Sequence, residues 1–469
     1  MPEPAPSSTQ TANPGHLPRV LTSTHATAIV VGIIIGSGIF LVPREMMEAV
    51  GSAKTVYTVW IVGGLLSLFG AMSYAELAAM KPRVGGEYAF LYEAYGPLTA
   101  FLYSWTWITI AKPATIASLS LGLMRVLGTF SAFSFLSHQA LALGSFHLLW
   151  SQVLALTATW LITLLNIVST LESANVQTAL TWLKVLMIVI IAGLCFAGFH
   201  HGSWHNFSTT FSGARRGFSG FMVALVAALW AYDGWSDVSQ MAGEVRDPQR
   251  SLPRALIGGV LTVGLLYMLT NAAIQYVLPA SAIAAADRPA SDALRIVAGD
   301  FGAGLVSVGM AISIGATFVG SALSGARIPF AAGQDKLFPP ALAAIHPRFH
   351  TPWASLILQA VISSALLLAV GTFQSLFSLA IFSEWLFYAL VTASLFVFRR
   401  REPNTLRPYR VTGYPVVPGL FILAALVLLV FSFMDEPRNS LIGAAVILCG
   451  IPIHLLYQRR SQPKTSSLG

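Results

Sequence analysis

The chain has 469 residues, of which 55% are hydrophobic and only 10% are charged, and its formal net charge is +8. Because a soluble protein carries about a quarter charged residues, this composition excludes a water-soluble domain. The basic residues stand in short loops between apolar runs, which excludes the single basic face of a nucleic-acid-binding protein. Both cysteines, Cys195 and Cys449, lie inside apolar runs and indicate neither a disulfide framework nor a metal pair.

Apolar runs long enough to cross a bilayer recur along the whole chain. The polar N-terminus, through about His25, lacks the pattern of a secretory signal, so the first apolar run is expected to stay in the mature protein. A transmembrane helix needs roughly 20 apolar residues. We therefore predict an all-α integral membrane protein of about twelve transmembrane helices. Their predicted ranges are 26–50, 56–80, 97–127, 148–169, 174–199, 217–240, 254–278, 303–332, 353–370, 374–398, 415–433 and 439–457.

The distribution of basic residues predicts the orientation. An even number of spans places both termini on one side, and the loops on that side contain Arg246, Arg250, Arg254, Arg399, Arg400, Arg401, Arg407, Arg410, Arg459, Arg460 and Lys464. The opposite loops carry fewer, chiefly Arg44, Lys54, Arg215, Arg216, Arg288, Arg295 and Arg438. By the positive-inside rule the terminal side is cytoplasmic. We expect a multi-pass protein of the inner membrane, with cytoplasmic tails at 1–25 and 458–469.

Two segments between spans are not expected to cross the membrane. Residues 84–96, VGGEYAFLYEAYG, are too polar to span and aromatic enough to lie flat, which predicts a short amphipathic helix on the cytoplasmic surface. Residues 280–302, with Asp287, Asp292 and Asp300, are predicted to form an external loop. Neither segment is a separate domain.

Two spans contain backbone breaks near their middle. The first span reads VVGIIIGSGIF, and each of its clustered glycines, Gly32, Gly36 and Gly38, weakens a helix by about 1 kcal/mol relative to Ala. Close helix packing is the alternative explanation, since Gly32 and Gly36 form a GxxxG pair. The sixth span has a second interruption, LWAYDGWSD, which places Asp233 and Gly234 inside an apolar helix. Paired interruptions in corresponding spans are typical of a transporter's binding site.

The first and sixth spans correspond if the first ten form two inverted five-helix repeats, 26–199 and 217–398, followed by two further helices within 415–457. Half-helix N-termini would then offer N–H groups to a carboxylate while freed carbonyls face an ammonium, which suits a zwitterionic amino acid. The predicted carboxylate donors are Ser37, Gly38 and Ile39. The predicted carbonyl acceptors are Ile34, Ile35, Trp230 and Ala231, with Gly36 between the two sets.

Five motifs in order resemble the amino acid–polyamine–organocation superfamily, and within it the prokaryotic type of the L-amino-acid transporter family. They are GSGIF at 36–40, YAELAAMKPRVGGEYAFLYEAYG at 74–96, the Lys184 region, AYDGWSD at 231–237 with EVRDPQRSLPRA at 244–255, and SGARIPFAAGQDKLFP at 324–339. The resemblance covers nearly all twelve spans. It implies the leucine-transporter fold, alternating access, substrate held between the unwound parts of spans one and six, and exchange of one amino acid for another.

One departure from that family concerns partners. Animal members of the family bind a heavy chain through a cysteine in the loop between spans three and four, but this loop, at about 128–147, has no cysteine. We therefore expect no disulfide-linked partner, and a monomer or a non-covalent oligomer in the lipid bilayer.

Lys184 lies well inside the fifth span, where an ionisable group costs at least about 2.5 kcal/mol and is a functional candidate by default. A lysine that reaches to the interface is the structural alternative. The family resemblance implies that its ammonium bridges span one, near the carbonyls of Ile34 to Gly36, to a hydroxyl of span eight, Ser313 or Thr317. It would then take the place of sodium, which predicts sodium-independent exchange. Proton coupling through Lys184 stays open.

Four other residues at membrane depth have competing interpretations. Asp233 either contacts the substrate, including a cationic one, or caps the second half of span six. Trp230 is expected, by the same resemblance, to cover the substrate as a lid, with ordinary packing as the alternative. Lys112, before Pro113, is read as structural or gating, and Glu384 as a proton-sensitive group or a satisfied partner of another helix; neither receives an assigned role.

A group of opposite charges lies at the cytoplasmic ends of spans two and six and is predicted to latch the inner gate, with a solvated network as the alternative. It consists of Glu76, Lys81, Arg83, Glu244, Arg246, Asp247, Arg250 and Arg254. The remaining functional classes receive less support. The ten histidines lie in loops or near span ends, so no catalytic, metal or cofactor site is predicted, and there is no phosphate-binding GxxxxGK[ST] motif. A proton-coupled amino acid or polyamine symporter and a substrate-gated channel stay as alternatives.

Overall fold

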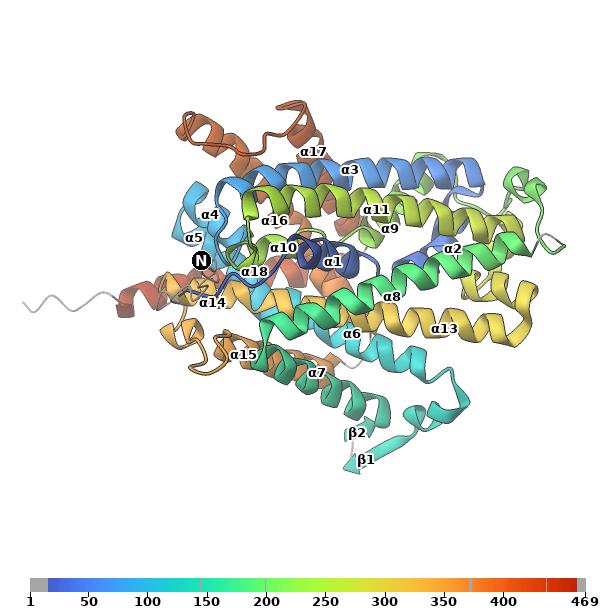
Figure 1. Ribbon diagram of the computed structural model, residues 1–469, viewed down its shortest axis with the longest axis horizontal. Coiled ribbons are helices and arrows are strands. Elements are labelled where there is room, and N and C mark those ends of the chain that lie inside the picture. The colour runs from blue at the N-terminus through green and yellow to red at the C-terminus, as the bar shows by residue number, and fades with distance from the viewer. Residues whose placement is uncertain (1–15, 144–145, 199, 371–372, 436, 462–469) are drawn as a thin grey trace, which may run out of the picture.

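The computed structural model describes residues 16–143, 146–198, 200–370, 373–435 and 437–461, so Lys464 and the first part of the predicted N-terminal tail lie outside the described residues. Apart from turns, loops and two isolated β-bridges, the described residues are helical except for one two-stranded antiparallel hairpin, β1 (Gln139–Leu143) and β2 (Phe146–Leu149), which overlaps the loop at 128–147. The long helices lie along one common direction, and the N-terminus of the described chain is at one end of them (Figure 1). We call this end the N-terminal face.

The first half of the described chain forms helices over most of the predicted ranges. Their bounds are α1 Ser23–Ile34, α2 Gly38–Val50, α3 Ala53–Met80, α4 Glu87–Tyr95, α5 Pro97–Thr106, a π-helical turn Trp107–Ala111, α6 Lys112–Leu127, a 3₁₀ segment Ser131–Ser137, α7 Trp150–Val168, α8 Thr170–Ala197 and a 3₁₀ turn Trp204–Ser208.

The second half continues in the same way. Its elements are α9 Gly217–Ala231, α10 Asp237–Gln240, a 3₁₀ turn Ala242–Glu244, α11 Pro248–Val277, α12 Ala280–Ala285, α13 Pro289–Gly325, α14 Arg327–Gln334, a 3₁₀ turn Pro340–Ala343, α15 Trp353–Val370, α16 Phe373–Arg401, α17 Val416–Asp435 and α18 Pro437–Ser461.

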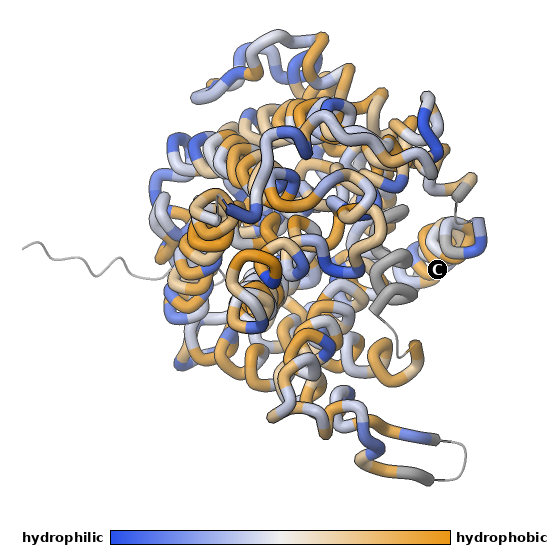
Figure 2. Tube along the Cα trace, turned by 90° about the vertical axis from the view of Figure 1, so that its right-hand side faces the viewer, coloured by the Kyte–Doolittle hydropathy of each residue, from blue (hydrophilic) through white to orange (hydrophobic). Residues whose placement is uncertain are grey.

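Nine helices in the described part of the chain are long and apolar enough to span a membrane, and the bent pair α1 and α2 makes a tenth. The other two predicted spans correspond to α9 with α10 and to α16, so the number twelve stays a prediction. Hydrophobic residues occur along the outer helices as well as the inner ones, as the hydropathy colours of the Cα trace show in a view along the bundle (Figure 2). Trp182 and Leu265, for example, are 60% and 73% exposed. Such a surface belongs in lipid rather than water.

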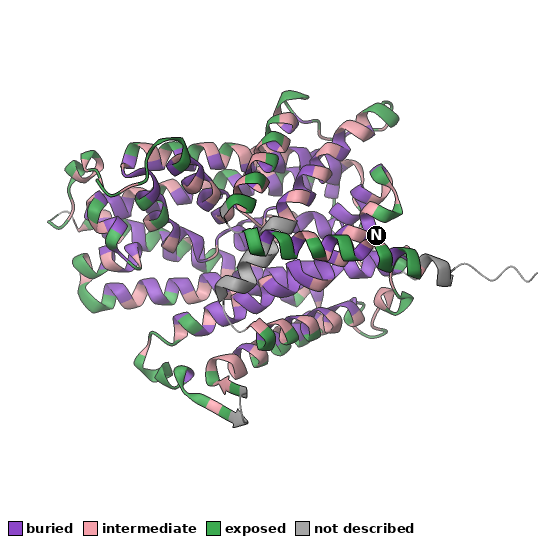
Figure 3. Ribbon diagram, turned by 180° about the vertical axis from the view of Figure 1, so that it is seen from behind, coloured by how far each residue is buried: buried purple, intermediate pink, exposed green. Residues whose placement is uncertain are grey.

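The buried residues gather around α1, which packs against α8, α11 and α13. Seen from behind, the central helices are mostly buried, whereas the hairpin and the C-terminal helix in front are largely exposed (Figure 3). The N-terminal half of the first predicted span therefore lies at the centre of the molecule.

Two predictions about the connecting segments are wrong. Helix α4 does not lie flat on a surface, because Glu87, Tyr88, Phe90 and Leu91 are all buried and the helix packs against α5, α14 and α16. The segment 280–302 is not an open loop, since it contains α12 and the first turns of α13, which is kinked at Ala298 and Gly299. Both segments looked too polar to span, and polarity alone did not distinguish a surface helix from a buried one.

Candidate functional site

The two predicted breaks lie against each other. Helix α1 ends at Ile34 and α2 begins at Gly38 with a bend of 41° between them, while α9 ends at Ala231 and α10 begins only at Asp237. Gly234, with φ +99°, packs so closely on Ile33 that a Cβ there would lie 2.5 Å from the Ile33 side chain. Glycine is the residue that tolerates both this φ and this close approach.

Tyr267 of α11 joins the two breaks. Its hydroxyl lies 2.7 Å from the carbonyl oxygen of Ala231 and 3.1 Å from that of Ile34. These two carbonyls belong to the residues at which α9 and α1 end, where the helix no longer supplies donors. The sequence analysis did not identify Tyr267 as a site residue. The available signal was that a tyrosine in an apolar span needs a hydrogen-bond partner for its hydroxyl.

Lys184 of α8 is buried, with 1% of its surface exposed, so it does not extend to the interface. Its ammonium donates to the carbonyls of Gly32 and Ile35, each at 2.6 Å, and to the carbonyl of Ser313 at 3.1 Å. The expected bridge from the first span to α13 is therefore present. It uses the backbone carbonyl of Ser313 rather than its hydroxyl.

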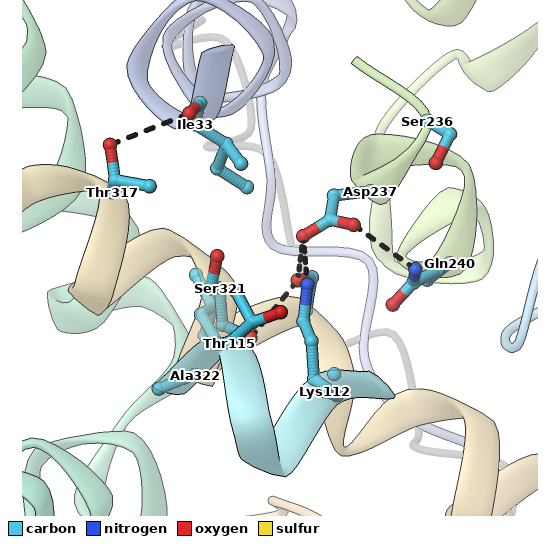
Figure 4. Close-up of polar contacts among 12 residues, drawn as sticks. Ile33, Lys112, Thr115, Ser236, Asp237, Gln240, Thr317, Ser321 and Ala322 are labelled. Atoms are coloured by element: carbon cyan, nitrogen blue, oxygen red, sulfur yellow. Dashed lines mark hydrogen bonds and ion pairs between the residues drawn. The ribbon is translucent and has the colours of Figure 1, made fainter. Parts of the chain in front are cut away.

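The hydroxyls of α13 bind the same break in the first span. Ser313 Oγ donates to the carbonyls of Ile35 and Gly36 at 2.8 and 2.9 Å. Thr317 Oγ1 lies within 3.2 Å of the carbonyls of Gly32 and Ile35 and 3.4 Å from that of Ile33, the contact drawn in Figure 4. The carbonyls exposed by the break are thus held by α8 and α13 together.

A cavity of about 90 Å³ lies between the breaks. A water needs roughly 10–15 Å³ of such space, so the cavity has room for a small solute. It is lined by Ile33, Ile34, Gly36, Ser37, Gly38, Lys112, Thr115, Ser118, Leu119, Trp230, Ala231, Asp233, Gly234, Asp237, Thr317, Ser321, Glu384 and Tyr388. Of the predicted residues, Ile35, Ile39, Lys184 and Ser313 are absent from this lining, and they lie behind it.

One side of the cavity carries an ion pair between Lys112 and Asp237. Lys112 follows the π-helical turn 107–111, and its ammonium contacts the Asp237 carboxylate (Figure 4). Ser324 Oγ and Gln240 Nε2 also donate to Asp237, at 2.7 and 3.2 Å. The pair gives Lys112, which had no assigned role, a buried partner. Asp237 was missed, although it is the second acid of the same AYDGWSD motif.

The cavity is also lined by a pair of carboxyl groups. Asp233 and Glu384 lie within hydrogen-bonding contact of each other, and the hydroxyl of Tyr388 donates to Asp233 Oδ1 at 2.9 Å. Helix α10 has Ser236 as its N-cap residue, without a capping bond from its side chain. Asp233 is therefore directed at α16 and the cavity, not at the start of α10.

Ion pairs that range from fully buried to partly exposed join the helices at the N-terminal face. Arg327 donates to both oxygens of Glu244, at 2.8 and 2.9 Å, and all these atoms belong to fully buried side chains. Arg399 binds both oxygens of Glu76 at 2.9 and 2.6 Å. Lys81 contacts Glu93 at 2.7 Å and Glu402 at 3.1 Å.

Glu76, Lys81, Arg83 and Glu244 of the predicted group therefore pair with residues outside that group, and their role as a latch of the inner gate stays a prediction. The other members of the group, Arg246, Asp247, Arg250 and Arg254, are exposed. At the opposite face a cavity of about 400 Å³ reaches Ser37, which also lines the central cavity. The central cavity thus adjoins this second cavity at Ser37. Among the described residues, no three His, Cys, Asp or Glu side chains are grouped as metal ligands.

Comparison with known proteins places this site in context. The sequence profile described as amino acid permease matches residues 21–454. The chain is 31% identical over 442 residues to the serine/threonine exchanger SteT of Bacillus subtilis, covering 93% of this chain and 96% of that protein. It is 30% identical over 442 residues to the human cystine/glutamate transporter, covering 94% and 85%. It is also 30% identical over 455 residues to the mouse b(0,+)-type amino acid transporter 1, covering 94% and 90%.

Proposed function

The chain belongs to the amino acid permease family, and we propose that it is a secondary transporter that exchanges L-amino acids by alternating access without sodium. The observation that carries this proposal is the meeting of the two backbone breaks at one buried cavity. The breaks fit two inverted five-helix repeats within a twelve-span protein, in which corresponding helices are interrupted at the substrate. The positive-inside rule makes the N-terminal face cytoplasmic.

The substrate carboxylate binds at the start of α2. The first N–H groups of a helix have no partner inside it and favour an anion, and Ser37, Gly38 and Ile39 stand at this point. The substrate ammonium faces the end of the first half-helix. The Ile34 carbonyl already accepts from the Gly36 N–H at 2.8 Å and lies 3.1 Å from the Tyr267 hydroxyl, so the substrate ammonium uses the second lone pair of the Ala231 carbonyl, beside the Tyr267 hydroxyl.

Asp233 and Trp230 face the side chain of the bound substrate. Trp230 lines the cavity beside the break and serves as its lid, while the carboxyl groups of Asp233 and Glu384 set the preference among side chains. These relatives are named for serine and threonine, for cystine and glutamate, and for b(0,+)-type amino acid transport. We therefore propose serine and threonine as the first candidate substrates. Arginine and lysine are further candidates because of the carboxyl pair.

Lys184 explains why the proposed exchange does not require sodium. Its ammonium holds the carbonyls of Gly32 and Ile35 and that of Ser313, and carbonyl oxygens arranged in this way are also the groups that bind a metal cation between two helices. A fixed ammonium keeps this cation position filled throughout the cycle. The proposed protein works alone or as a non-covalent oligomer, with no disulfide-linked heavy chain.

The test is counterflow in proteoliposomes. Purified protein is reconstituted with each of the twenty common amino acids inside, and uptake of the same radiolabelled amino acid is compared with that into empty liposomes, in sodium and in choline buffer. The proposal predicts uptake that depends on internal amino acid and is equal in both buffers. Uptake without internal substrate that never saturates would indicate a channel, and failure of all twenty amino acids would refute the proposal.

A further inference from the structure

Lys112 is the one positively charged side chain among the described residues that line the central cavity. It is the first residue of α6 and is buried. Asp237, the first residue of α10, is also buried, and the two side chains point toward each other (Figure 4). The other acidic residues of the lining are Asp233 and Glu384. The positive charge that a substrate side chain can meet in this cavity is therefore that of Lys112.

The Lys112 ammonium is held in place by groups other than Asp237. Its hydrocarbon stem passes Gly325 at the end of α13, where a Cβ would lie 2.4 Å from Lys112 Cγ. The ammonium lies 5.1 Å from the centre of the Trp107 ring, a distance at which an aromatic face attracts a cation. The ring N–H of Trp107 donates in turn to the Gly325 carbonyl at 3.3 Å. Removal of the Asp237 charge should therefore leave the ammonium at the cavity wall.

Asp237 neutralises this ammonium. Its Oδ2 accepts from both the Lys112 ammonium and Ser324 Oγ, the latter at 2.7 Å. Its Oδ1 accepts from Gln240 Nε2 at 3.2 Å. Within the described part of the chain, Lys112 forms an ion pair with no other acid. The pair therefore presents no net charge to a substrate in the cavity.

A substrate with an acidic side chain is disfavoured by this arrangement. Its carboxylate has to leave water, and a buried charge needs a partner of opposite charge. The Lys112 ammonium already has such a partner, and Asp233 and Glu384 add no positive charge to the lining. An uncharged side chain of similar shape does not carry this cost. The cavity should therefore distinguish glutamate from glutamine by charge.

We propose that Asp237 is a specificity-determining residue, which excludes acidic amino acids from the cavity by occupying the Lys112 ammonium. This inference rests on the proposed exchange of amino acids. Neutralisation of Asp237 leaves a buried ammonium without an anion. The side-chain carboxylate of glutamate or aspartate then takes the place of the Asp237 carboxylate, and the chain accepts acidic substrates.

The test compares the two acidic amino acids with their amides, which are similar in shape and differ in charge. The full chain in liposomes exchanges the labelled amino acid that gives the largest wild-type counterflow, near neutral pH. Unlabelled glutamate, glutamine, aspartate or asparagine competes from outside. The measured quantity is the half-inhibitory concentration of each acid divided by that of its amide. For the wild type we expect a ratio of about ten or more, because the site leaves the acid's charge unpaired.

The variants separate charge from shape. Asp237→Asn and Asp237→Ser should each lower the ratio about tenfold, because both free the Lys112 ammonium. The double variant Asp237→Asn with Lys112→Met removes both charges and should restore a high ratio. Asp335→Asn is the matched control, since it makes the same change in a carboxylate outside the cavity lining, 3.5 Å from Arg83. It should keep the wild-type ratio.

Thermal unfolding in detergent tests the same point without transport. A ligand that binds the folded state raises its unfolding midpoint. Glutamate should raise the midpoint of Asp237→Asn more than glutamine does, because it supplies the missing anion to Lys112. In the wild type glutamate should have the smaller effect of the two.

Three results would overturn the inference. They are equal competition by acids and amides in the wild type, a ratio that neither Asp237 variant lowers, and a double variant that accepts acids as well as Asp237→Asn does. If the wild type excludes the amides together with the acids, size rather than charge is responsible, and the inference is also overturned. Absence of wild-type counterflow with all twenty amino acids would refute the proposed function instead.

Discussion

The hydroxyl of Tyr267 lies 2.7 Å from the carbonyl oxygen of Ala231, where the ninth helix ends, and the same hydroxyl reaches the end of the first helix at Ile34. One side chain of α11 therefore holds the ends of both broken helices. Any motion that separates the two breaks during transport has to release at least one of these contacts.

Tyr267→Phe should weaken this connection while keeping the ring in place. The substitution leaves the carbonyl of Ala231 without its donor, whereas the carbonyl of Ile34 keeps the N–H of Gly36. An unsatisfied buried acceptor costs about 1–3 kcal/mol. We expect a lower midpoint of thermal unfolding and a counterflow rate reduced severalfold, both measured on purified protein. Tyr232→Phe is the matched control, because Tyr232 packs on Tyr267 but its hydroxyl has only a 3.4 Å contact with Trp60. Equal effects of the two changes would contradict the assigned role of Tyr267.

Lys184→Ala should abolish most exchange while substrate binding partly survives. The change removes the ammonium that holds Gly32, Ile35 and Ser313, whereas the N–H groups at the start of α2 remain. Counterflow measures exchange, and binding of labelled amino acid to detergent-solubilised protein measures the site. Lys54→Ala, at an exposed position, is the control. An unchanged exchange rate in Lys184→Ala would disprove this explanation. A sodium requirement for exchange by the wild type would also disprove it.

The pair Arg327 and Glu244 should be essential for closure of the N-terminal face. Removing one partner of a buried, bidentate pair leaves an uncompensated charge and costs about 3–5 kcal/mol. We expect Arg327→Met to destabilise the protein strongly, and the double variant with Glu244→Gln to recover part of the loss. A double-mutant cycle on the unfolding midpoint measures this coupling.

The partly exposed pair Arg83 and Glu93, joined at 3.1 Å, provides the comparison for that cycle. An exposed pair contributes at most about 1 kcal/mol, so its two single substitutions should be nearly silent and additive. A coupling energy for Arg327 and Glu244 no larger than that for Arg83 and Glu93 would show that the buried pair is not the closing contact.

The sequence predicted those parts of the site that depend on local backbone chemistry. The clustered glycines around Gly36 and the acid beside Gly234 stand at the two breaks, so both breaks could be located without coordinates. The position of Lys184 in an apolar run also required a buried partner. Resemblance to the family then indicated the first span and α13 as the helices that it joins.

Contacts between distant residues could not be read in this way. Arg327 and Glu244 are 83 positions apart, and either one alone is an ordinary charge near a helix end. Glu87 was placed on a membrane surface because its helix is polar, yet that helix is buried. Hydropathy records how polar a segment is, and it does not record which other helices surround it.

The stability of the folded protein should depend on pH through Glu87. Burial raises its pKa to about 8, above the value of about 4.3 in an unfolded chain. Between these two values the folded state holds a proton that the unfolded state has lost, so the contribution of Glu87 is fully present below pH 4 and decreases as the pH rises toward 8. The slope approaches 1.4 kcal/mol per pH unit.

Glu87→Gln replaces the carboxyl group with a neutral group of similar shape and should remove this dependence. We expect the variant and the wild type to unfold at similar temperatures near pH 4.5 in detergent, and the variant to unfold at the higher temperature near pH 8.5. Glu93→Gln, whose carboxylate is paired with Lys81 at 2.7 Å, should not show this crossover, because it removes a charge that the folded state stabilises. A difference between Glu87→Gln and wild type that stays constant with pH would mean that Glu87 is ionised in the folded protein.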